Sequence, residues 1–114
     1  MDSIEKEIIK FRDERDWKQF HNARTLAASI VIESAELLEL FQWAKDEEIE
    51  EIVEKKLDKI KDEIADIYAY LVILAHDLGI NLQDAVREKM KKNARKYPVD
   101  KAKGTSKKYT EFVE

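Results

Sequence analysis

Between residues 57 and 78, apolar side chains recur every three or four residues, a period that fits an α-helix and not a β-strand. This stripe consists of Leu57, Ile60, Ile64, Ile67, Leu71, Leu74 and Leu78. The other faces of the same helix carry Tyr68, Val72 and Ile73, and a helix that is apolar on every side must be covered on every side. In a chain of only 114 residues, we expect part of that cover to come from another subunit.

The rest of the chain is also rich in helix-forming residues. Only two Gly and one Pro occur among 114 residues, so residues that break helices are scarce. We therefore predict an all-α fold, a bundle of four to five helices, in one domain that spans residues 1–114. The expected helices cover residues 3–16, 23–44, about 57–78 and about 82–96, and the polar segment 45–56 is a short helix or an exposed connection.

Capping residues indicate where these helices begin and end. Ser3 is the expected N-cap of the first helix and Asn22 that of the second, because both side chains accept hydrogen bonds from free backbone amides. Gly79 is expected to end the long helix. Asn81 is expected to cap the last helix, which must stop before Pro98 because the residue preceding a proline avoids the helical region.

Two of the expected helices carry far fewer charges than the chain as a whole, which is 40% charged. The charges that remain are carboxylates: Glu33 and Glu36 within TLAASIVIESAELL, and Glu63 and Asp66 at the start of EIADIYAYLVILA. The members of each pair are three residues apart, so their side chains lie within reach of each other on one helix face. An ionised carboxylate in apolar surroundings needs a proton, a basic partner or a metal ion.

The simplest common partner for these four carboxylates is a hard divalent cation with oxygen ligands. Mg²⁺ is favoured, with Mn²⁺ as the alternative, because such ions share carboxylates with water and substrate phosphates. No His follows any of these acids by three residues, which argues against a di-iron site built from Glu-x-x-His pairs. The spacing alone is a weak signal in a Glu-rich chain, and it leaves a metal site and solvated carboxylates both open.

Five stretches of the chain, taken together, resemble a known family. They are RDWKQFHNARTL, ESAELLELFQW, DEIADIYAYLV, KMKKNARKYPV and KYTEF, in this order. They look like the MazG-like superfamily of all-α nucleoside triphosphate pyrophosphohydrolases, and most of all like its dCTP pyrophosphatase branch. The resemblance extends from about Glu14 to Phe112.

The resemblance implies an oligomeric helix bundle, a homodimer or homotetramer, that hydrolyses a (deoxy)nucleoside triphosphate to the monophosphate and pyrophosphate. It implies dCTP or a modified dCTP as the leading substrate. By analogy with the family, Glu33, Glu36, Glu63 and Asp66 would hold Mg²⁺, and Glu33 or Glu36 would orient or deprotonate the attacking water.

The resemblance also implies residues that bind the substrate. Lys89, Asn93 and Tyr97 recur on one face of the last helix and would contact phosphates, and Trp17 and Trp43 would stack on the base. Tyr70 would lie near the sugar, and His21 is a further candidate. Without the family, the residues favour a solvated Lys89, a Tyr97 at the edge of the core and a Trp17 that fastens a loop onto the bundle.

Composition limits the other possibilities. The chain has no Cys and a net charge of −4, so we expect no disulfide and no nucleic acid partner. With no long apolar span and an acidic, amphipathic N-terminus, we expect no membrane partner and a cytoplasmic location. A basic, flexible tail is expected at residues 99–114. The open alternatives are broad NTP or dUTP hydrolysis, phosphoribosyl-ATP hydrolysis on the same fold, and a non-catalytic helical interaction module.

Overall fold

A computed structural model of the chain describes residues 2–112. Over these residues the all-α prediction is confirmed, because they form six α-helices and three short 3-10 helices, with no strand. The chain divides into two compact units, the first ending at Ile80 and the second beginning at Asn81. Among residues 2–112, no helix is both long enough and apolar enough to cross a membrane.

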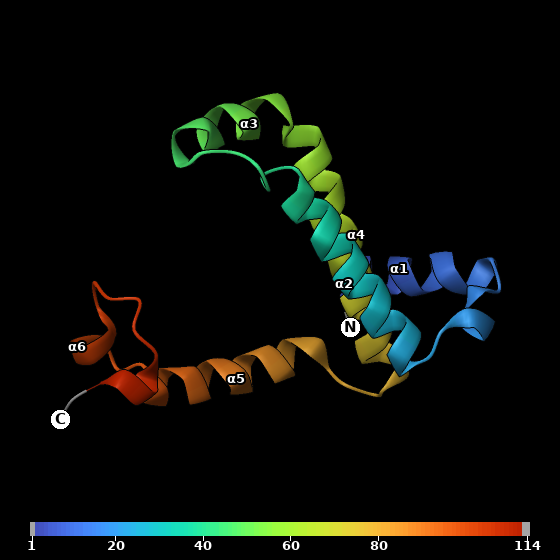
Figure 1. The fold of residues 1–114 in the computed structure, drawn as a ribbon. Helices are drawn as coiled ribbons and strands as arrows, with labels where there is room; N and C mark the ends of the chain where they lie inside the picture. The colour runs from blue at the N-terminus through green and yellow to red at the C-terminus, as the bar shows by residue number, and fades with distance from the viewer. Residues whose placement is uncertain (1, 113–114) are drawn as a thin grey trace. The chain divides into compact units, whose positions relative to one another are not determined.

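The first unit is built on two helices, α2 (Ala23–Glu39) and α4 (Leu57–Asp77), which lie side by side and run in opposite directions (Figure 1). Helix α1 (Ser3–Glu14) packs across α4. The core between these three helices contains the buried side chains of Ile9, Leu26, Val72, Ile73 and Ala75. This packing fixes the faces of α2 and α4 that carry the acidic pairs.

The N-cap of helix α1 lies one residue before the predicted one. The N-cap is Asp2 and not Ser3: its carboxylate accepts a hydrogen bond of 2.9 Å from the amide of Glu5, and the Glu5 carboxylate accepts one of 3.3 Å from the amide of Asp2. Such a reciprocal pair satisfies two amides that a helix start leaves free. The buried face of α1 consists of Glu5, Ile9 and Arg12.

Helix α2 begins as predicted and ends early. The Asn22 side chain accepts a hydrogen bond of 2.9 Å from the amide of Thr25, and the Thr25 hydroxyl accepts one of 2.9 Å from the amide of Asn22. At the other end, the amide of Phe41 bonds to the carbonyl of Leu38 at 2.9 Å, which tightens the chain into turns. The helix therefore stops at Glu39. The prediction that it continues through residues 40–44 is wrong, because residues 40–43 form turns.

For the segment between α2 and α4, the sequence predicted either a short helix or an exposed connection, and the structure shows short helices. It contains a 3-10 helix, η2 (Asp46–Glu48), and helix α3 (Ile49–Lys55). Helix α4 ends at Asp77, and Gly79 terminates it as predicted, because Gly79 adopts a φ of 69°, which a residue with a side chain rarely does. The amides of Gly79 and Ile80 bond back to the carbonyls of His76 and Ala75, at 3.1 and 2.8 Å, and so close the helix.

The second unit contains helix α5 (Leu82–Lys96), helix α6 (Val99–Ala102) and a 3-10 helix, η3 (Tyr109–Glu111). Asn81 caps α5 by accepting a hydrogen bond of 3.0 Å from the amide of Asp84, and α5 ends before Pro98, both as predicted. After α6 the chain returns, so that the rings of Tyr109 and Phe112 pack edge-on against Tyr97, with centroids 5.9 and 5.7 Å away.

Candidate metal and nucleotide site

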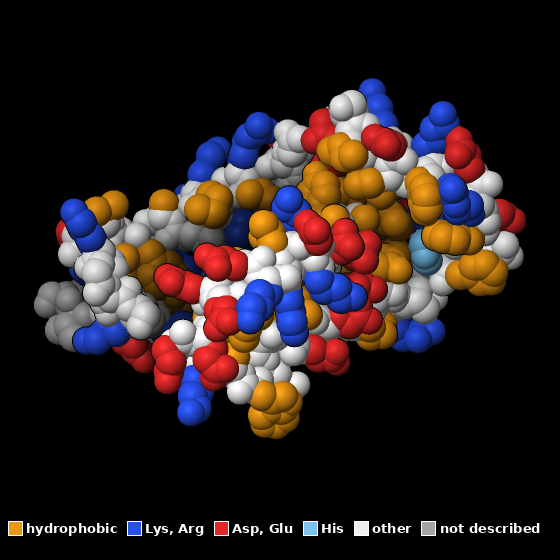
Figure 2. Space-filling view, turned by 90° about the horizontal axis from the view of Figure 1, so that it is seen from above, with side chains coloured by type: hydrophobic (Ala, Val, Ile, Leu, Met, Phe, Trp, Pro, Cys, Tyr) orange, Lys and Arg blue, Asp and Glu red, His pale blue; other side chains and the backbone are white. Residues whose placement is uncertain are grey.

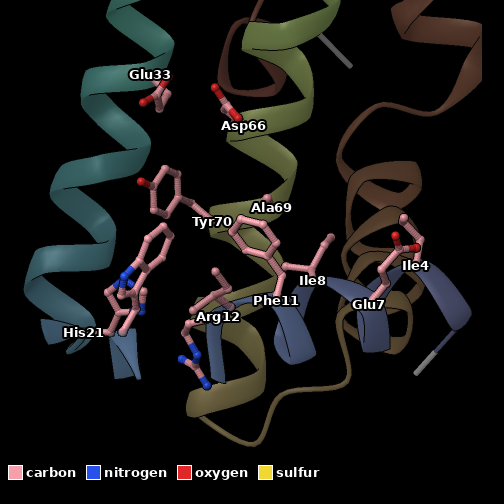
Figure 3. Close-up of a pocket in the computed structure, with 12 residues that line it drawn as sticks. Ile4, Glu7, Ile8, Phe11, Arg12, His21, Glu33, Asp66, Ala69 and Tyr70 are labelled. Atoms are coloured by element: carbon pink, nitrogen blue, oxygen red, sulfur yellow. The ribbon is translucent and has the colours of Figure 1, made fainter. Parts of the chain in front are cut away.

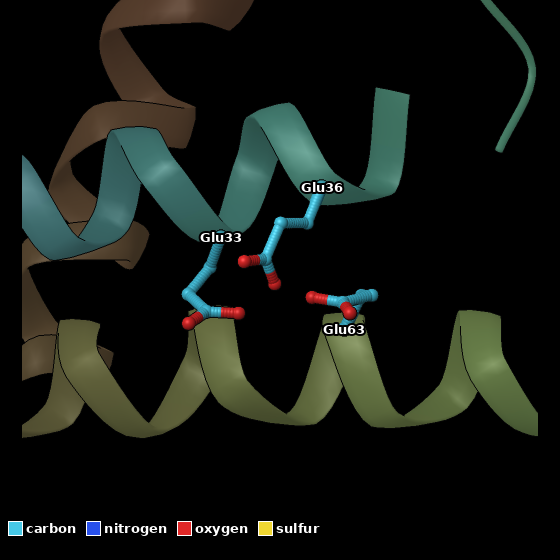
Figure 4. A group of neighbouring side chains, drawn as sticks. All are labelled: Glu33, Glu36 and Glu63. Carbon is cyan, nitrogen blue, oxygen red and sulfur yellow. The ribbon is translucent and has the colours of Figure 1, made fainter. Parts of the chain in front are cut away.

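Three of the four predicted ligands meet between α2 and α4. Glu33 and Glu36 lie one turn apart on α2, and both point toward Glu63 on α4 (Figure 4). Each of the three offers a carboxylate oxygen, and these oxygens all lie within 4.8 Å of one another. We call this set the carboxylate triad. It arises because a spacing of three residues puts Glu33 and Glu36 on one helix face, and the pairing of α2 with α4 puts Glu63 opposite them.

The carboxylate triad carries more negative charge than the nearby cations neutralise. Glu63 is only 3% exposed, and its one ion pair in the described structure is with Lys59, whose ammonium is 3.3 Å from the Glu63 Oε1 atom. One oxygen of Glu33 and one of Glu63 are buried without a hydrogen-bond partner within residues 2–112. A buried polar group in this state is costly.

The surroundings raise the pKa of Glu33 to about 7. Burial is the largest cause. Side-chain hydrogen bonding with the carboxyl groups of Glu63 and Glu36, which favours the protonated form of Glu33, and the negative charges of Glu36 and Asp66 raise the pKa further. A proton or a bound cation is therefore needed at this position near neutral pH.

The carboxylate triad fits a divalent cation. Carboxylate oxygens are the ligands that hard cations prefer, and two buried oxygens of the triad, one of Glu33 and one of Glu63, have no hydrogen-bond partner within residues 2–112. Oxygens around Mg²⁺ at about 2.1 Å lie at most about 4.2 Å apart. A group of oxygens spread over 4.8 Å needs only a small side-chain adjustment to reach that geometry.

Asp66, the fourth predicted ligand, is not a member of the triad. It lies on the next turn of α4 after Glu63, is exposed, and faces Glu33 across a pocket (Figure 3). The structure thus places Asp66 at the edge of the acidic site, close enough to Glu33 to raise its pKa.

A pocket of about 310 Å³ extends from the acidic site toward α1. Glu33 and Asp66 lie at one end of it, Arg12 and His21 lie at the other, and Tyr70 lies between them (Figure 3). Its apolar wall includes the side chains of Ile4, Ile8, Phe11, Trp17, Ala69 and Ile73. The structure therefore brings three predicted substrate-binding residues, Trp17, His21 and Tyr70, into one pocket with two of the predicted metal ligands.

The turn after α1 positions Trp17 in this pocket. Asp16 adopts a left-handed conformation, with a φ of 54°, and the chain then enters the 3-10 helix η1 (Trp17–Phe20). The Trp17 ring packs edge-on against Phe11, with ring centroids 5.7 Å apart. This contact keeps the indole at the pocket and leaves part of it exposed.

Trp43 is not brought to the pocket. Its side chain is 88% exposed, and it lies in the turns that follow α2. The prediction extended α2 to residue 44, but the helix stops at Glu39, so the helical spacing that relates Trp43 to the acidic face is lost.

Lys89, Asn93 and Tyr97 all belong to the second unit. Lys89 is exposed on α5, the Asn93 amide lies 3.9 Å from the Met90 sulfur, and Tyr97 packs against the rings described above. Their role toward phosphates stays a prediction.

The sequence reasoning missed Arg12. This side chain is 1% exposed, lines the pocket, and donates hydrogen bonds to Asp77 at 2.7 Å and to Asp13 at 3.0 Å. Burial lowers the pKa of Arg12, but the two carboxylates outweigh it and the pKa is raised, so the guanidinium is always charged. The available signal was its spacing from Glu5 and Ile9, which places Arg12 on the buried face of α1.

Comparison with known proteins identifies the family. A family model described as MazG-like matches residues 28–112. The chain belongs to the MazG-like family. The family resemblance predicted from sequence is therefore confirmed, and the acidic helix pair α2 and α4 lies inside the matched region.

Individual relatives within the MazG-like family are similar over most of the chain. The dCTP pyrophosphatase 1 of Bos taurus is 40% identical, and the match covers 98% of this chain and 68% of that protein. The human dCTP pyrophosphatase 1 is 39% identical, with 98% and 67% covered. The crystal structure of a pyrophosphatase from Archaeoglobus fulgidus is 46% identical, with a TM-score of 0.77, and the match covers 80% of this chain and 85% of that one.

Proposed function

We propose that this protein hydrolyses dCTP, or a modified dCTP, to the monophosphate and pyrophosphate with the help of Mg²⁺ or Mn²⁺. Membership in the MazG-like family and the pyrophosphatase relatives make the chain a nucleoside triphosphate pyrophosphohydrolase. One observation above all supports the site: Glu33, a member of the carboxylate triad, lines a partly apolar pocket together with Trp17 and Tyr70. A phosphate group with its cation needs charged ligands, whereas a flat base needs apolar and aromatic side chains. This pocket offers carboxylates at one end and apolar and aromatic side chains along its wall.

The residues of the site have distinct proposed roles. Glu33, Glu36 and Glu63 hold the divalent cation, with Asp66 beside them. The cation, when bound, neutralises phosphate oxygens and lowers the pKa of water. Water adds to phosphorus as the anhydride bond between the α- and β-phosphates breaks, and the water proton passes to Glu33 or Glu36, whichever carboxylate has a free oxygen. Pyrophosphate leaves, and the nucleoside keeps one phosphate.

The other end of the pocket suits the nucleoside. Trp17 offers a partly exposed ring for stacking on the base, His21 lines the same pocket, and Tyr70 would crowd a ribose 2′-hydroxyl. We assign Lys89, Asn93 and Tyr97 to the phosphates and Trp43 to the base on the family resemblance alone. We further propose that the protein works in the cytoplasm on the free nucleotide pool.

The test is a panel of canonical and modified dNTPs and NTPs, each incubated with the protein and Mg²⁺, with separation of monophosphate, diphosphate and pyrophosphate. We expect dCTP or a modified dCTP to be the best substrate and to give only monophosphate and pyrophosphate. Equal turnover of all triphosphates would replace the proposal with broad NTP hydrolysis. Absence of turnover with both Mg²⁺ and Mn²⁺ would favour the helical interaction module.

We propose that the protein is a homo-oligomer, a homodimer or homotetramer, because α4 carries an exposed apolar seam. The seam consists of residues seven apart, Leu57, Ile64, Leu71 and Leu78, with exposed fractions of 45%, 54%, 38% and 55%. A seven-residue spacing keeps side chains on one helix face, as in helices that pair. Hydrophobic side chains also gather in patches on the face drawn in Figure 2. A second copy of the chain would remove such surface from water.

Leu71→Lys is expected to reduce the oligomer to monomers, because a charge in an apolar interface must be desolvated without a partner. The measurement is molar mass by size-exclusion chromatography with light scattering. Asp62→Lys, at an exposed position on another face of α4, is the matched control and should leave the mass unchanged. A parent protein that is already monomeric would contradict the oligomer proposal.

A further inference from the structure

Arg12 occupies the end of the pocket opposite the carboxylate triad. Its side chain is 99% buried, and two of its three guanidinium nitrogens have partners: Nη1 donates to Asp77 at 2.7 Å and Nε donates to Asp13 at 3.0 Å. The third nitrogen, Nη2, is buried without a hydrogen-bond partner within residues 2–112. The pocket thus ends in a fixed cation that has an unused donor.

The pairing with Asp77 holds this cation in place. Asp77 is the last residue of α4, and its side chain is 18% exposed. Burial would raise the pKa of Asp77, but the hydrogen bond and charge of Arg12 outweigh it, so the pKa is lowered and the carboxylate stays ionised. A buried ion pair often stabilises a protein less than apolar side chains of the same size would. Stability alone therefore does not account for a charged pair with an unsatisfied donor at a pocket.

His21 adds a second unused polar atom at the same end. Its Nδ1 atom is buried without a partner in the described structure, and the side chain lines the pocket. Burial and then the charge of Arg12 lower the pKa of His21, so its ring is neutral at neutral pH. A neutral imidazole has one donor and one acceptor nitrogen, whereas a guanidinium only donates.

We propose that Arg12, held by Asp77, is a specificity-determining residue that donates a hydrogen bond to the base and selects cytosine over uracil and thymine. The inference rests on the proposed function, because it requires the base to enter this pocket. Cytosine carries two adjacent acceptors, the C2 carbonyl oxygen and N3. In uracil and thymine N3 bears a hydrogen, which opposes a guanidinium donor. A site built around a buried donor discriminates strongly against a ligand that leaves the donor unpaired.

His21 completes this recognition. When the His21 ring carries its proton on Nε2, its Nδ1 atom accepts a hydrogen bond from the cytosine amino group. Nη2 of Arg12 is closed to solvent in this structure, so contact with a base requires a local shift of the side chains around it. We expect Trp17 and His21 to make this shift, because both line the same pocket and neither is fully buried.

The test compares the parent protein with Arg12→Gln and with the double variant Arg12→Gln/Asp77→Asn, which keeps a neutral hydrogen-bonded pair between α1 and α4. Two quantities are measured: kcat/KM for dCTP and dUTP, and the binding of dCMP and dUMP by calorimetry. We expect the preference for the cytosine nucleotide to fall by about 10- to 100-fold in both assays and both variants. Lys10→Gln, which removes an exposed charge from α1, is the matched control and should keep the preference.

A purely structural role for Arg12 predicts a different result. Both nucleotides would then lose kcat/KM and affinity by the same factor, the preference would stay constant, and the proposal would be overturned. A parent protein that binds dCMP and dUMP equally would overturn it too. If the parent cleaves no triphosphate but binds dCMP selectively, and Arg12→Gln removes that selectivity, the proposed function fails and the role of Arg12 stands.

Discussion

Glu36→Gln is expected to lower kcat for the best triphosphate by about a thousandfold or more, since loss of several kcal/mol of transition-state stabilisation has that effect. The substitution keeps the size of the side chain and removes one charged oxygen ligand from the carboxylate triad. The weakened cation then neutralises less of the phosphate charge, and one of the two candidate proton acceptors is gone. The measurement is steady-state release of pyrophosphate at saturating Mg²⁺.

Glu39→Gln is the matched control, because Glu39 is exposed on the same helix and is not in the triad. It should keep the parent activity. The fold is checked by thermal unfolding in EDTA, where Glu36→Gln should be at least as stable as the parent because it removes repulsion among like charges. A variant that retains more than about a tenth of the parent kcat, a loss under 1.4 kcal/mol, would exclude Glu36 as an essential ligand.

The second large effect is a stabilisation by Mg²⁺ that depends on pH. An ion at about 100 times its Kd adds about 2.7 kcal/mol to the free energy of unfolding, which for a domain of this size raises Tm by about 10 °C. The pKa of Glu33 in the folded protein is about 7, against 4.5 as its ordinary value. A folded-state pKa above the unfolded one means that metal-free protein loses stability as pH rises from 4.5 to 7.

The cost of ionising Glu33 and the competition between proton and cation both make Mg²⁺ stabilise the protein more at high pH than at low pH. Above pH 7 Glu33 is ionised at a cost that the cation relieves, whereas at pH 5.5 a proton occupies Glu33 and competes with the cation. We therefore expect the rise in Tm on adding Mg²⁺ to be large at pH 8 and much smaller at pH 5.5, at constant ionic strength. Glu33→Gln removes the titrating group and should flatten this dependence. A Tm increment that is the same at both pH values in the parent would contradict the role of Glu33.

The carboxylate triad was predictable from sequence because helix geometry is regular. Once Glu33 and Glu36 are on one helix and Glu63 on another, a spacing of three residues and the apolar faces around them leave few arrangements. The pairing of α2 with α4 follows from burial of these faces. Glu47 and Glu50 have the same spacing of three residues but lie in a polar segment and are exposed. Only Asp66 lies differently, at the rim of the pocket.

Arg12 and Trp43 show where the sequence was insufficient. An arginine on an amphipathic helix normally faces water, and nothing near Arg12 in the sequence points to its partner Asp77, which is 65 positions away. The position of Trp43 depends on where α2 ends, and the ends of helices are the least predictable part of a helix. The burial of Arg12 and the position of Trp43 depend on tertiary contacts or on chain direction, which residue spacing within one helix does not determine.

The unpartnered oxygens of Glu33 and Glu63 mean that the metal-free protein carries local energetic frustration at its site. The rest of the first unit, with its capped helices and apolar core, holds these groups together although they repel each other. Folding thus supplies the free energy that brings the repelling carboxylates together. The cation then binds to preorganised ligands, and its binding relieves their repulsion. Substitutions that ease this frustration would make a more stable protein and a poorer binder of metal, which is the usual tension between stability and activity.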